Sequence, residues 1–392
     1  MKRTLALNLN AFPAGFPPSL QTPGAPLTHQ DTITVDLRSL CSHMYRDTFG
    51  FSSPRQNPLY ALYKGMVTSN QELEFVAGAL GSHKEARVSE NMKMGKAFCR
   101  WFCDNHLGIS HFAHMDDILG HTAPQQFQGV QVKRVAPLDT PDYLCATRNG
   151  TVCLAEAKGR QKTAISFTNA AFGQWRQQFT RVQIQNAGGV LMSVKGYIVA
   201  TRFRNQSHGS RIKSTLYCED PATRGEPLDE ETQAVLHRIV FARHYSSVFD
   251  ALNLPLQSAA LRYGFTLTDD SPVTVGLWKC LVPPLDNLLF VGGLIPPDGP
   301  ECLGWPPFWN GDTFRDLQWN PNLIAGRSVF FGLEKAQFQI VLDACRNRIE
   351  TITNAATDLP LPVVLPEELS LTGDSSLVAP EAYMRLTNVV TM

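Results

Sequence analysis

The spacing of apolar residues predicts that the middle of the chain folds as an α/β domain. In residues 89–105, Met94, Phe98, Trp101 and Phe102 recur at three- and four-residue intervals, which is typical of a helix with one buried side. Short apolar runs bounded by polar or glycine-containing turns predict strands. The predicted helices cover residues 71–81, 89–105, 167–184, 228–252 and 333–352, and the predicted strands cover residues 129–136, 142–147, 151–157 and 190–203, the last as one strand or a pair.

These patterns divide the chain into four parts. Residues 1–70 predict a proline-rich N-terminal arm with small elements, in which residues 1–30 run extended across a surface. Residues 71–218 carry the order of helix, strands, helix and strand that predicts the α/β domain. Residues 219–354 predict an additional α+β region of unknown role, and residues 355–392 predict an extended tail.

A hairpin in residues 140–160 (TPDYLCATRNGTVCLAEAKGR) carries charges at its outer ends. Alternate side chains of a strand share a face, so Glu156 and Lys158 lie on the same face at the end of the second strand. Asp142 opens the first strand. Buried carboxylates are unfavourable unless they are paired, so their placement beside apolar strands calls for a partner.

The length of the hairpin loop decides whether the two carboxylates face each other. A two-residue turn at Asn149 and Gly150 would place Asp142 opposite Ala157. A three-residue loop, 148–150, with its glycine in the left-handed region places Asp142 opposite Glu156 instead. We predict the second register, or a bulge with the same effect.

Two carboxylates that face each other at ~5 Å repel unless a cation neutralises them. Oxygen ligands suit a hard divalent cation, so the pair predicts Mg²⁺ or Mn²⁺ at Asp142 and Glu156. Lys158 lies one step along the same face, where it could hold an attacking water or stabilise charge on phosphoryl oxygens. The alternative is an exposed strand-end pair of Glu156 and Lys158 that contributes little.

These residues resemble the signature of the PD-(D/E)xK nuclease superfamily. Pro141 and Asp142 match its first part, and Glu156, Ala157 and Lys158 match its second. The resemblance implies a restriction-endonuclease-like mixed sheet flanked by helices. It also implies a metal held by Asp142, Glu156 and the carbonyl of Ala157, with Lys158 positioning the water.

The resemblance covers residues 85–205 and implies further site residues. Many members add a glutamate from the preceding helix, for which Glu90 is the best match and Glu85 the alternative. Some members place a glutamine on the following helix. The candidates here are Gln174, Gln177 and Gln178. We favour the first or the last of these, which share a helix face.

Positive charge is concentrated after the hairpin. No Asp or Glu occurs from Ala157 to Cys218, and this pattern predicts contacts to the phosphates of a nucleic acid. An ordinary solvated basic face is the alternative. The basic residues of this span are Lys158, Arg160, Lys162, Arg176, Arg181, Lys195, Arg202, Arg204, Arg211 and Lys213.

A second group of polar residues precedes the hairpin. His106, His111, His114 and His121 cluster near two aspartates, and two of these histidines are three residues apart. Such spacing suits a metal on a helix, but the flanking residues favour a strand or loop. We therefore favour surface or core histidines here.

Composition narrows the class of protein. The 392 residues are 43% apolar, and Lys+Arg and Asp+Glu balance at 35 each, so the chain as a whole is not a polycation. Nine cysteines without a CxxC pair predict reduced thiols and a cytoplasmic protein. The start lacks the apolar run of a signal peptide, and no run is long enough to span a membrane.

The sequence as a whole predicts a metal-dependent nuclease that hydrolyses phosphodiester bonds. DNA is preferred over RNA only because the resemblance favours it. One alternative is a non-catalytic nucleic-acid-binding or scaffold subunit on the same fold. Another is a defence or restriction-type nuclease that stays silent until a partner or signal releases it. A second copy of the chain or a regulatory protein is a further partner that the sequence leaves open.

Overall fold

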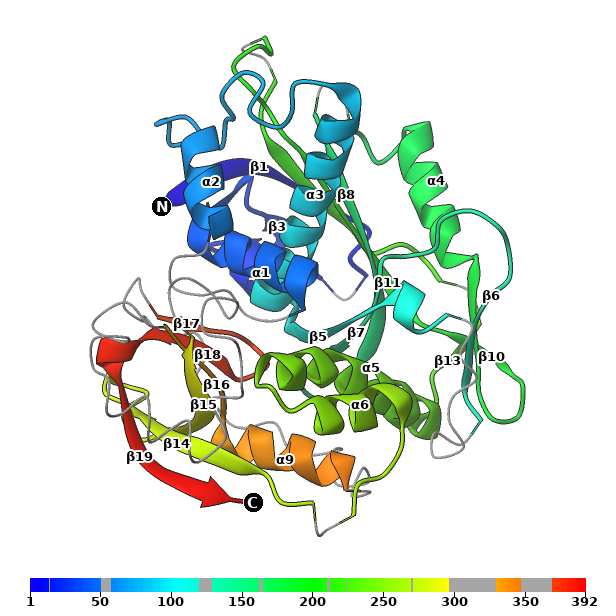
Figure 1. Cartoon of the computed structure of the whole chain (residues 1–392). Helices are drawn as coiled ribbons and strands as arrows, with labels where there is room; N and C mark the ends of the chain where they lie inside the picture. Colours follow the sequence, from blue (N-terminus) through cyan, green and yellow to red (C-terminus); the bar gives the residue numbers. More distant parts are fainter. Residues whose placement is uncertain are drawn as a thin grey trace. The chain divides into compact units, whose positions relative to one another are not determined.

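Strands and helices are mixed throughout the part of the chain that the computed structural model describes, which confirms the predicted α/β class. The described residues are 1–13, 15–50, 58–119, 129–161, 165–209, 212–223, 225–268, 271–295, 329–346 and 369–392. They belong to two compact units (Figure 1). Unit 1 comprises Met1–Thr48 and Pro58–Phe241, and unit 2 comprises Phe49–Asn57 and Ala242–Met392.

A seven-stranded mixed sheet forms the centre of unit 1, in the order β4-β1-β12-β11-β8-β7-β5. The pairs β1–β12 and β8–β11 are parallel, and the other neighbours are antiparallel. The strands are β1 (Lys2–Asn10), β4 (Thr32–Asp36), β5 (Ile109–His114), β7 (Tyr143–Thr147), β8 (Val152–Arg160), β11 (Lys195–Arg202) and β12 (Thr215–Glu219).

Helices cover both faces of this sheet. Helix α3 lies along β8 on one face, and α4 lies on the other (Figure 1). A Cβ atom on Gly95 of α3 would lie 2.5 Å from the backbone nitrogen of Gly159, so only glycine permits this close approach. The helices of unit 1 are α1 (Leu37–Phe49), α2 (Pro58–Met66), α3 (Lys84–Leu107), α4 (Ala170–Phe179) and the first part of α5 (Glu230–Ala251).

The prediction that residues 1–30 run extended across a surface was wrong. Strand β1 pairs with β12 and with β4 inside the main sheet. Its alternating Leu5, Leu7 and Leu9 are all buried in the core. Period-two burial of three leucines stabilises a strand strongly, and proline-rich composition further along the chain obscured this local signal. A two-stranded sheet, β2 (Gln21–Thr22) and β3 (Ala25–His29), follows.

The predicted helix at 71–81 is also absent. Glu72 and Phe75 form isolated bridges to Thr4 and Asn205, which hold this segment extended. Gly78 and Gly81 have positive φ and close turns after it. Pairing with segments distant in the sequence therefore overrides the local helical pattern.

A second, four-stranded sheet in unit 1 includes parts of three predicted elements. Predicted strand 129–136 and the end of predicted helix 167–184 lie in it as β6 and β9. Predicted segment 190–203 splits between this sheet, as β10, and the main sheet, as β11. The order is β13-β10-β9-β6, and the bounds are β6 (Gln131–Arg134), β9 (Val182–Gln185), β10 (Leu191–Ser193) and β13 (Glu226–Pro227).

Unit 2 has a sheet of its own, in the order β17-β18-β16-β15-β14-β19. Trp278, Phe290, Phe330 and Leu377 are among the buried residues of its core. The last part of α5 belongs to this unit. The other elements are α6 (Pro255–Tyr263), β14 (Thr274–Cys280), β15 (Leu289–Ile295), β16 (Val329–Glu334), α9 (Lys335–Cys345), β17 (Ser370–Leu371), β18 (Ser376–Pro380) and β19 (Met384–Thr391).

The prediction of an extended tail at 355–392 was wrong for its described part. Strands β17 and β18 continue the sheet beyond β16, and β19 pairs with β14 along eight residues. The backbone of residues 369–392 therefore forms ladder hydrogen bonds with segments that include β14, more than a hundred residues earlier. Such long-range pairing is not visible in a local pattern.

Two expectations from composition can be compared with the described residues. Their eight cysteines are all buried and none forms a disulfide, as predicted for reduced thiols. Among the same residues, no helix is both long enough and apolar enough to cross a membrane.

Candidate active site

The β7–β8 hairpin has the predicted register. Tyr143 pairs with Ala155 and Ala146 with Val152, which extends to Asp142 opposite Glu156. The loop is closed by a hydrogen bond from the Thr147 backbone N–H to the Thr151 carbonyl at 2.9 Å. Gly150 has φ +87°, the left-handed conformation that a three-residue loop requires. Local turn chemistry therefore sets the position of the carboxylate pair.

Asp142 and Glu156 come together where β7 starts and β8 continues past it, paired only with β11. The Asp142 Oδ2 accepts a hydrogen bond from the backbone N–H of Ala157 at 2.9 Å, which fixes the aspartate against β8. The side chains of Asp142 and Glu156 are within hydrogen-bonding reach of each other. Glu156 is fully buried, whereas 20% of the Asp142 side chain is exposed. The pair therefore has one buried and one accessible member.

Two groups bind Glu156 from the face covered by α4. The Lys158 ammonium forms an ion pair with Glu156 Oε1, and 24% of the lysine side chain is exposed. The amide of Gln178, oriented with its nitrogen toward the acid, donates to both carboxylate oxygens, to Oε2 at 2.7 Å. Gln178 is buried, whereas Gln174 and Gln177 are exposed and form no contact with the pair. The structure thus selects one of the three predicted glutamines.

Helix α3 contributes a residue that sequence reasoning missed. Lys96 Nζ lies 3.5 Å from Asp142 Oδ1, so each carboxylate has its own ammonium partner. The signal was present in the sequence as Gly95, because a small residue inside a helix often marks a close approach to a neighbouring element. Lys96, the residue after Gly95, therefore lies beside Asp142 at the start of β7.

The predicted acids of α3 are not brought to the carboxylate pair. Glu90 forms an ion pair with Lys93 at 2.9 Å and accepts a short hydrogen bond from the Tyr63 hydroxyl of α2. Glu85 lies in the first turn of α3, where it pairs with His83 and is 81% exposed. The helix phase explains both results, because the residues that face the end of β8 are Asn91 and Gly95.

The electrostatics of the cluster disfavour the ionised form of Glu156. Burial is the main cause that raises the pKa of Glu156 well above its usual value, and the nearby Asp142 carboxylate raises it further. The Lys158 ammonium partly offsets both effects. A buried acid with a strongly raised pKa beside a second carboxylate is typical of functional sites, although structural pairs also produce it.

The donor set fits one hard divalent cation. It offers two carboxylates and the carbonyl of Ala157, whose N–H already points to the edge where β7 has ended. The N–H and C=O of a strand residue point to the same side, so that carbonyl points toward Asp142 as well. Among the described residues, however, no group of three or more His, Cys, Asp and Glu side chains is arranged to hold a metal. The candidate ligands are therefore two side chains and a backbone oxygen.

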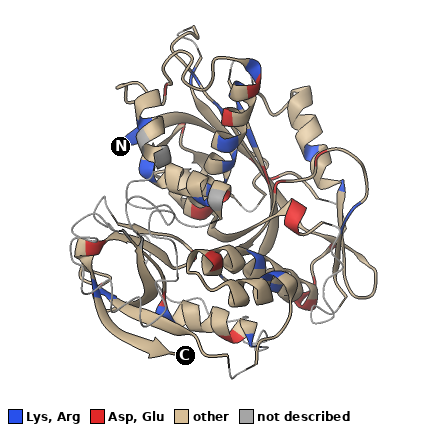
Figure 2. Ribbon diagram, viewed as in Figure 1, with Lys and Arg blue, Asp and Glu red and all other residues tan. Residues whose placement is uncertain are grey.

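Most of the described basic residues after the hairpin are paired with acids from outside that span. Figure 2 shows acidic and basic positions interspersed in unit 1. The pairs are Arg176–Glu219 at 2.7 Å, Lys195–Asp220 at 2.8 Å, Arg204–Glu74 at 2.9 Å and Lys213–Glu72 at 3.8 Å. The long acid-free span therefore overstates the positive charge that is left for a ligand.

Other basic residues of the span lack a carboxylate partner in the described part of the chain. Arg181 and Arg202 donate to the backbone carbonyls of Asp139 and Lys213. The guanidinium of Arg160 lies 5.2 Å from the centre of the Trp175 ring. Lys162 and Arg211 lie outside the described residues.

The histidines before the hairpin are dispersed. His111 is buried beside Ser110, and His106 forms a hydrogen bond with Ser19. His114 ends β5, and its Nε2 lies 3.4 Å from Asp47 Oδ1. His121 lies outside the described residues. The contacts agree with the favoured prediction of core and surface histidines.

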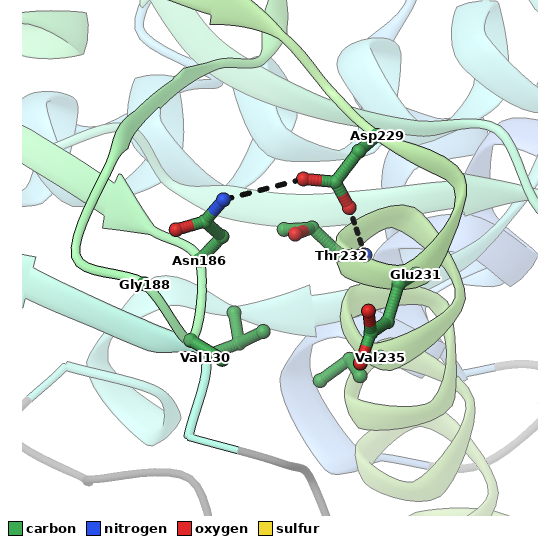
Figure 3. Close-up of a pocket in the computed structure, with 8 residues that line it drawn as sticks. Val130, Asn186, Gly188, Asp229, Glu231, Thr232 and Val235 are labelled. Atoms are coloured by element: carbon green, nitrogen blue, oxygen red, sulfur yellow. Dashed lines mark hydrogen bonds between the residues drawn. The ribbon is translucent and has the colours of Figure 1, made fainter.

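A small pocket of about 110 Å³ in unit 1 lies apart from these residues (Figure 3). Its most polar lining residue, Asp229, accepts from the backbone N–H of Thr232 at 2.6 Å and from Asn186 at 3.3 Å. The carboxylate therefore caps the start of α5. None of the predicted site residues lines this pocket.

Comparison of the chain with protein-family models, with curated proteins and with solved structures found no match.

Proposed function

We propose that this chain is a metal-dependent nuclease with a restriction-endonuclease-like core, and that it cleaves DNA. One observation supports this most. Asp142, Glu156 and Lys158 converge at the open end of the β7–β8 hairpin, with the glutamate buried and the lysine accessible. A mixed sheet with α3 and α4 on opposite faces provides the frame that such an enzyme uses. The reduced cysteines support a cytoplasmic location.

Each residue has a chemical task in this proposal. Asp142, Glu156 and the Ala157 carbonyl would hold Mg²⁺ or Mn²⁺, which supplies positive charge for the phosphate and lowers the pKa of bound water. An ammonium carries three donors, so Lys158 can bind Glu156 and still orient a water or a phosphoryl oxygen. Gln178 holds the buried glutamate in place. The water oxygen bonds to phosphorus, the bond to one bridging oxygen breaks, and that oxygen leaves with a proton.

The test is cleavage of plasmid and single-stranded DNA with Mg²⁺, Mn²⁺, Ca²⁺ or EDTA. Glu156→Gln and Lys158→Ala are each expected to lower the cleavage rate roughly 10²–10³-fold, the effect of removing one preorganised charged group. Lys213→Ala is the matched control, because this exposed lysine comes from the same basic span but forms its ion pair with Glu72, away from the carboxylate pair. Wild-type cleavage rates in both site variants would reject the proposal.

A second candidate function has an observation of its own. Lys96 and Lys158 already neutralise the two carboxylates, as in a site that binds no metal. A non-catalytic nucleic-acid-binding subunit would keep this arrangement. It predicts salt-dependent DNA binding, no heat of Mn²⁺ binding and no cleavage in any metal. A nuclease that a partner must release, such as a defence effector, would bind Mn²⁺ and cut only after the partner is added.

A further inference from the structure

The position of Lys96 follows from the packing of α3 on β8. The contact of Gly95 with Gly159 brings the helix backbone against the strand, and the next residue then reaches the end of β7. There Lys96 Nζ lies 3.5 Å from Asp142 Oδ1, while Asp142 Oδ2 is held by the Ala157 N–H. Both oxygens of the accessible carboxylate therefore have a positively polarised partner.

A rigid platform keeps Lys96 in this place. Its ammonium lies 5.9 Å from the centre of the Tyr143 ring, and the Tyr143 hydroxyl donates a short hydrogen bond to Asp47. Asp47 is in turn bound by Arg100 at 3.3 Å and by His114 at 3.4 Å. The lysine is 27% exposed, so its ammonium also reaches solvent. The platform orients the charge without removing it from the surface.

We infer that the active site takes a single divalent cation, and that Lys96 supplies the positive charge that a second cation would bring. This inference rests on the proposed nuclease function. A second cation at Asp142 Oδ1 would lie against the Lys96 ammonium and would need further oxygen ligands. In the described part of the chain, the nearby acids of α1 and α3 are engaged elsewhere, Asp47 with Arg100 and Glu90 with Lys93.

Lys96 acts in this scheme as a positioning residue. It holds Asp142 oriented from the α3 face, while Lys158 binds Glu156 from the α4 face. Because a cation and an ammonium repel when they share one carboxylate, Lys96 weakens metal binding at the same time as it assists turnover. A residue with a purely structural role would not produce opposite changes in these two quantities.

The test is calorimetric titration of the full chain with Mn²⁺, without nucleic acid, alongside the cleavage assay. Wild-type protein is expected to bind one Mn²⁺ per chain. Lys96→Gln should bind one Mn²⁺ about fivefold more tightly, the effect of removing one partly exposed charge contact. Its Mg²⁺-dependent cleavage rate should fall about tenfold or more. Lys96→Glu, which adds a third carboxylate, should bind two Mn²⁺.

Lys93→Gln is the matched control, because this lysine lies on the same helix but pairs with Glu90. It should keep wild-type Mn²⁺ affinity, stoichiometry and cleavage. Binding of two Mn²⁺ per wild-type chain, together with active cleavage, would overturn the inference and leave the nuclease proposal standing. A Lys96→Gln variant with wild-type Mn²⁺ affinity and a wild-type cleavage rate would do the same. Wild-type protein that neither binds Mn²⁺ nor cuts DNA would reject the nuclease proposal, and this inference with it.

Discussion

Two buried carboxylates, one in each unit, show how similar burial can indicate different roles. Glu156 in unit 1 is fully buried, and Asp374 in unit 2 is 2% exposed. Asp374 accepts hydrogen bonds from the backbone and side chain of Ser376 and from Thr372, and His244 Nε2 lies 2.9 Å from its Oδ2. Glu156 also has donors, but it faces a second carboxylate at the open end of a strand.

The difference separates a structural acid from a candidate functional one. Around Asp374 the donors come from a tight turn and from α5, and they satisfy the charge of the acid within the core. Around Glu156 the opposing Asp142 disfavours the charged form, the Lys158 ammonium offsets this only in part, and an added cation would offset it further. Burial alone does not identify a site; a buried acid beside a second acid does so more specifically.

The largest expected effect is on the stability of unit 2. Asp374→Ala removes the acceptor that the buried side chains of His244 and Ser376 share with the half-buried Thr372 hydroxyl, and should destabilise the protein by about 3–5 kcal/mol. Urea unfolding measures this. The control is Asp250→Ala, which removes the exposed ion pair with Arg262 and should cost less than about 1 kcal/mol. Equal losses in the two variants would contradict a structural role for the buried network.

Glu156→Gln should change stability in the opposite direction. A folded-state pKa raised above the usual 4.5 means that the folded chain holds a proton that the unfolded chain releases. The stabilisation is therefore complete below pH 4.5 and is lost as the pH rises toward the folded-state pKa. The variant should accordingly gain stability over the wild type as the pH rises above 4.5. A variant that is less stable than the wild type at pH 8 would show that Glu156 is a structural acid like Asp374.

A second comparison concerns two buried histidines, one with a carboxylate and one without. His244 lies against Asp374, whereas the Nε2 of His237 has no hydrogen-bond partner among the described residues. Burial, and to a smaller extent the charge of Arg238, lowers the pKa of His237 from 6.5 to about 4. The folded chain therefore binds fewer protons than the unfolded chain between these two pH values.

The sign of this effect gives a prediction of intermediate size. The part of the stability that depends on His237 should be complete above pH 6.5 and should fall by about 2–3 kcal/mol as the pH drops to 4. His237→Leu should reduce the loss of stability between pH 6.5 and pH 4. Part of the loss should remain in this variant, because burial also lowers the pKa of His106 to about 4. Urea unfolding at pH 7 and pH 4 tests this. An unchanged pH dependence in His237→Leu would show that the imidazole is not the responsible group.

Sequence reasoning succeeded where the determining interactions are local. The loop that contains Asn149 and Gly150 sets the hairpin register within a few residues, and the predicted register with Asp142 opposite Glu156 is confirmed. The strand β1 was also visible in principle, through the alternation of Leu5, Leu7 and Leu9. Its partner β12 begins about two hundred residues later, so the sequence pattern did not show that β1 lies in the central sheet.

The remaining parts of the site depend on how helices rotate against the sheet. Gln174 and Gln178 share a helix face, and only the packing of α4 brings the second one to Glu156. On α3, the contact at Gly95 turns Lys96 toward Asp142, whereas Glu90 accepts a hydrogen bond from the Tyr63 hydroxyl instead. A helix phase of this kind is set by tertiary contacts, which a single sequence does not reveal.

The smallest expected effect distinguishes two arginines of the basic span. Arg160 shares a strand face with Glu156 and Lys158, and its guanidinium lies over the Trp175 ring without a carboxylate partner in the described part of the chain. The Arg176 guanidinium donates two hydrogen bonds to Glu219, one to each carboxylate oxygen. If the proposed DNA site is correct, Arg160 contacts a phosphate next to the one that is cut, whereas Arg176 positions α4.

Arg160→Gln should therefore weaken DNA binding by about 1 kcal/mol and lower the slope of log affinity against log salt by about 1. Arg176→Gln should leave that slope unchanged, because its charge is already neutralised within the fold. Fluorescence anisotropy with labelled DNA in Ca²⁺ at several salt concentrations measures both slopes. If the two arginines change the slope equally, then pairing with acids does not decide which basic residues reach the nucleic acid, and the whole span must be considered again as its ligand surface.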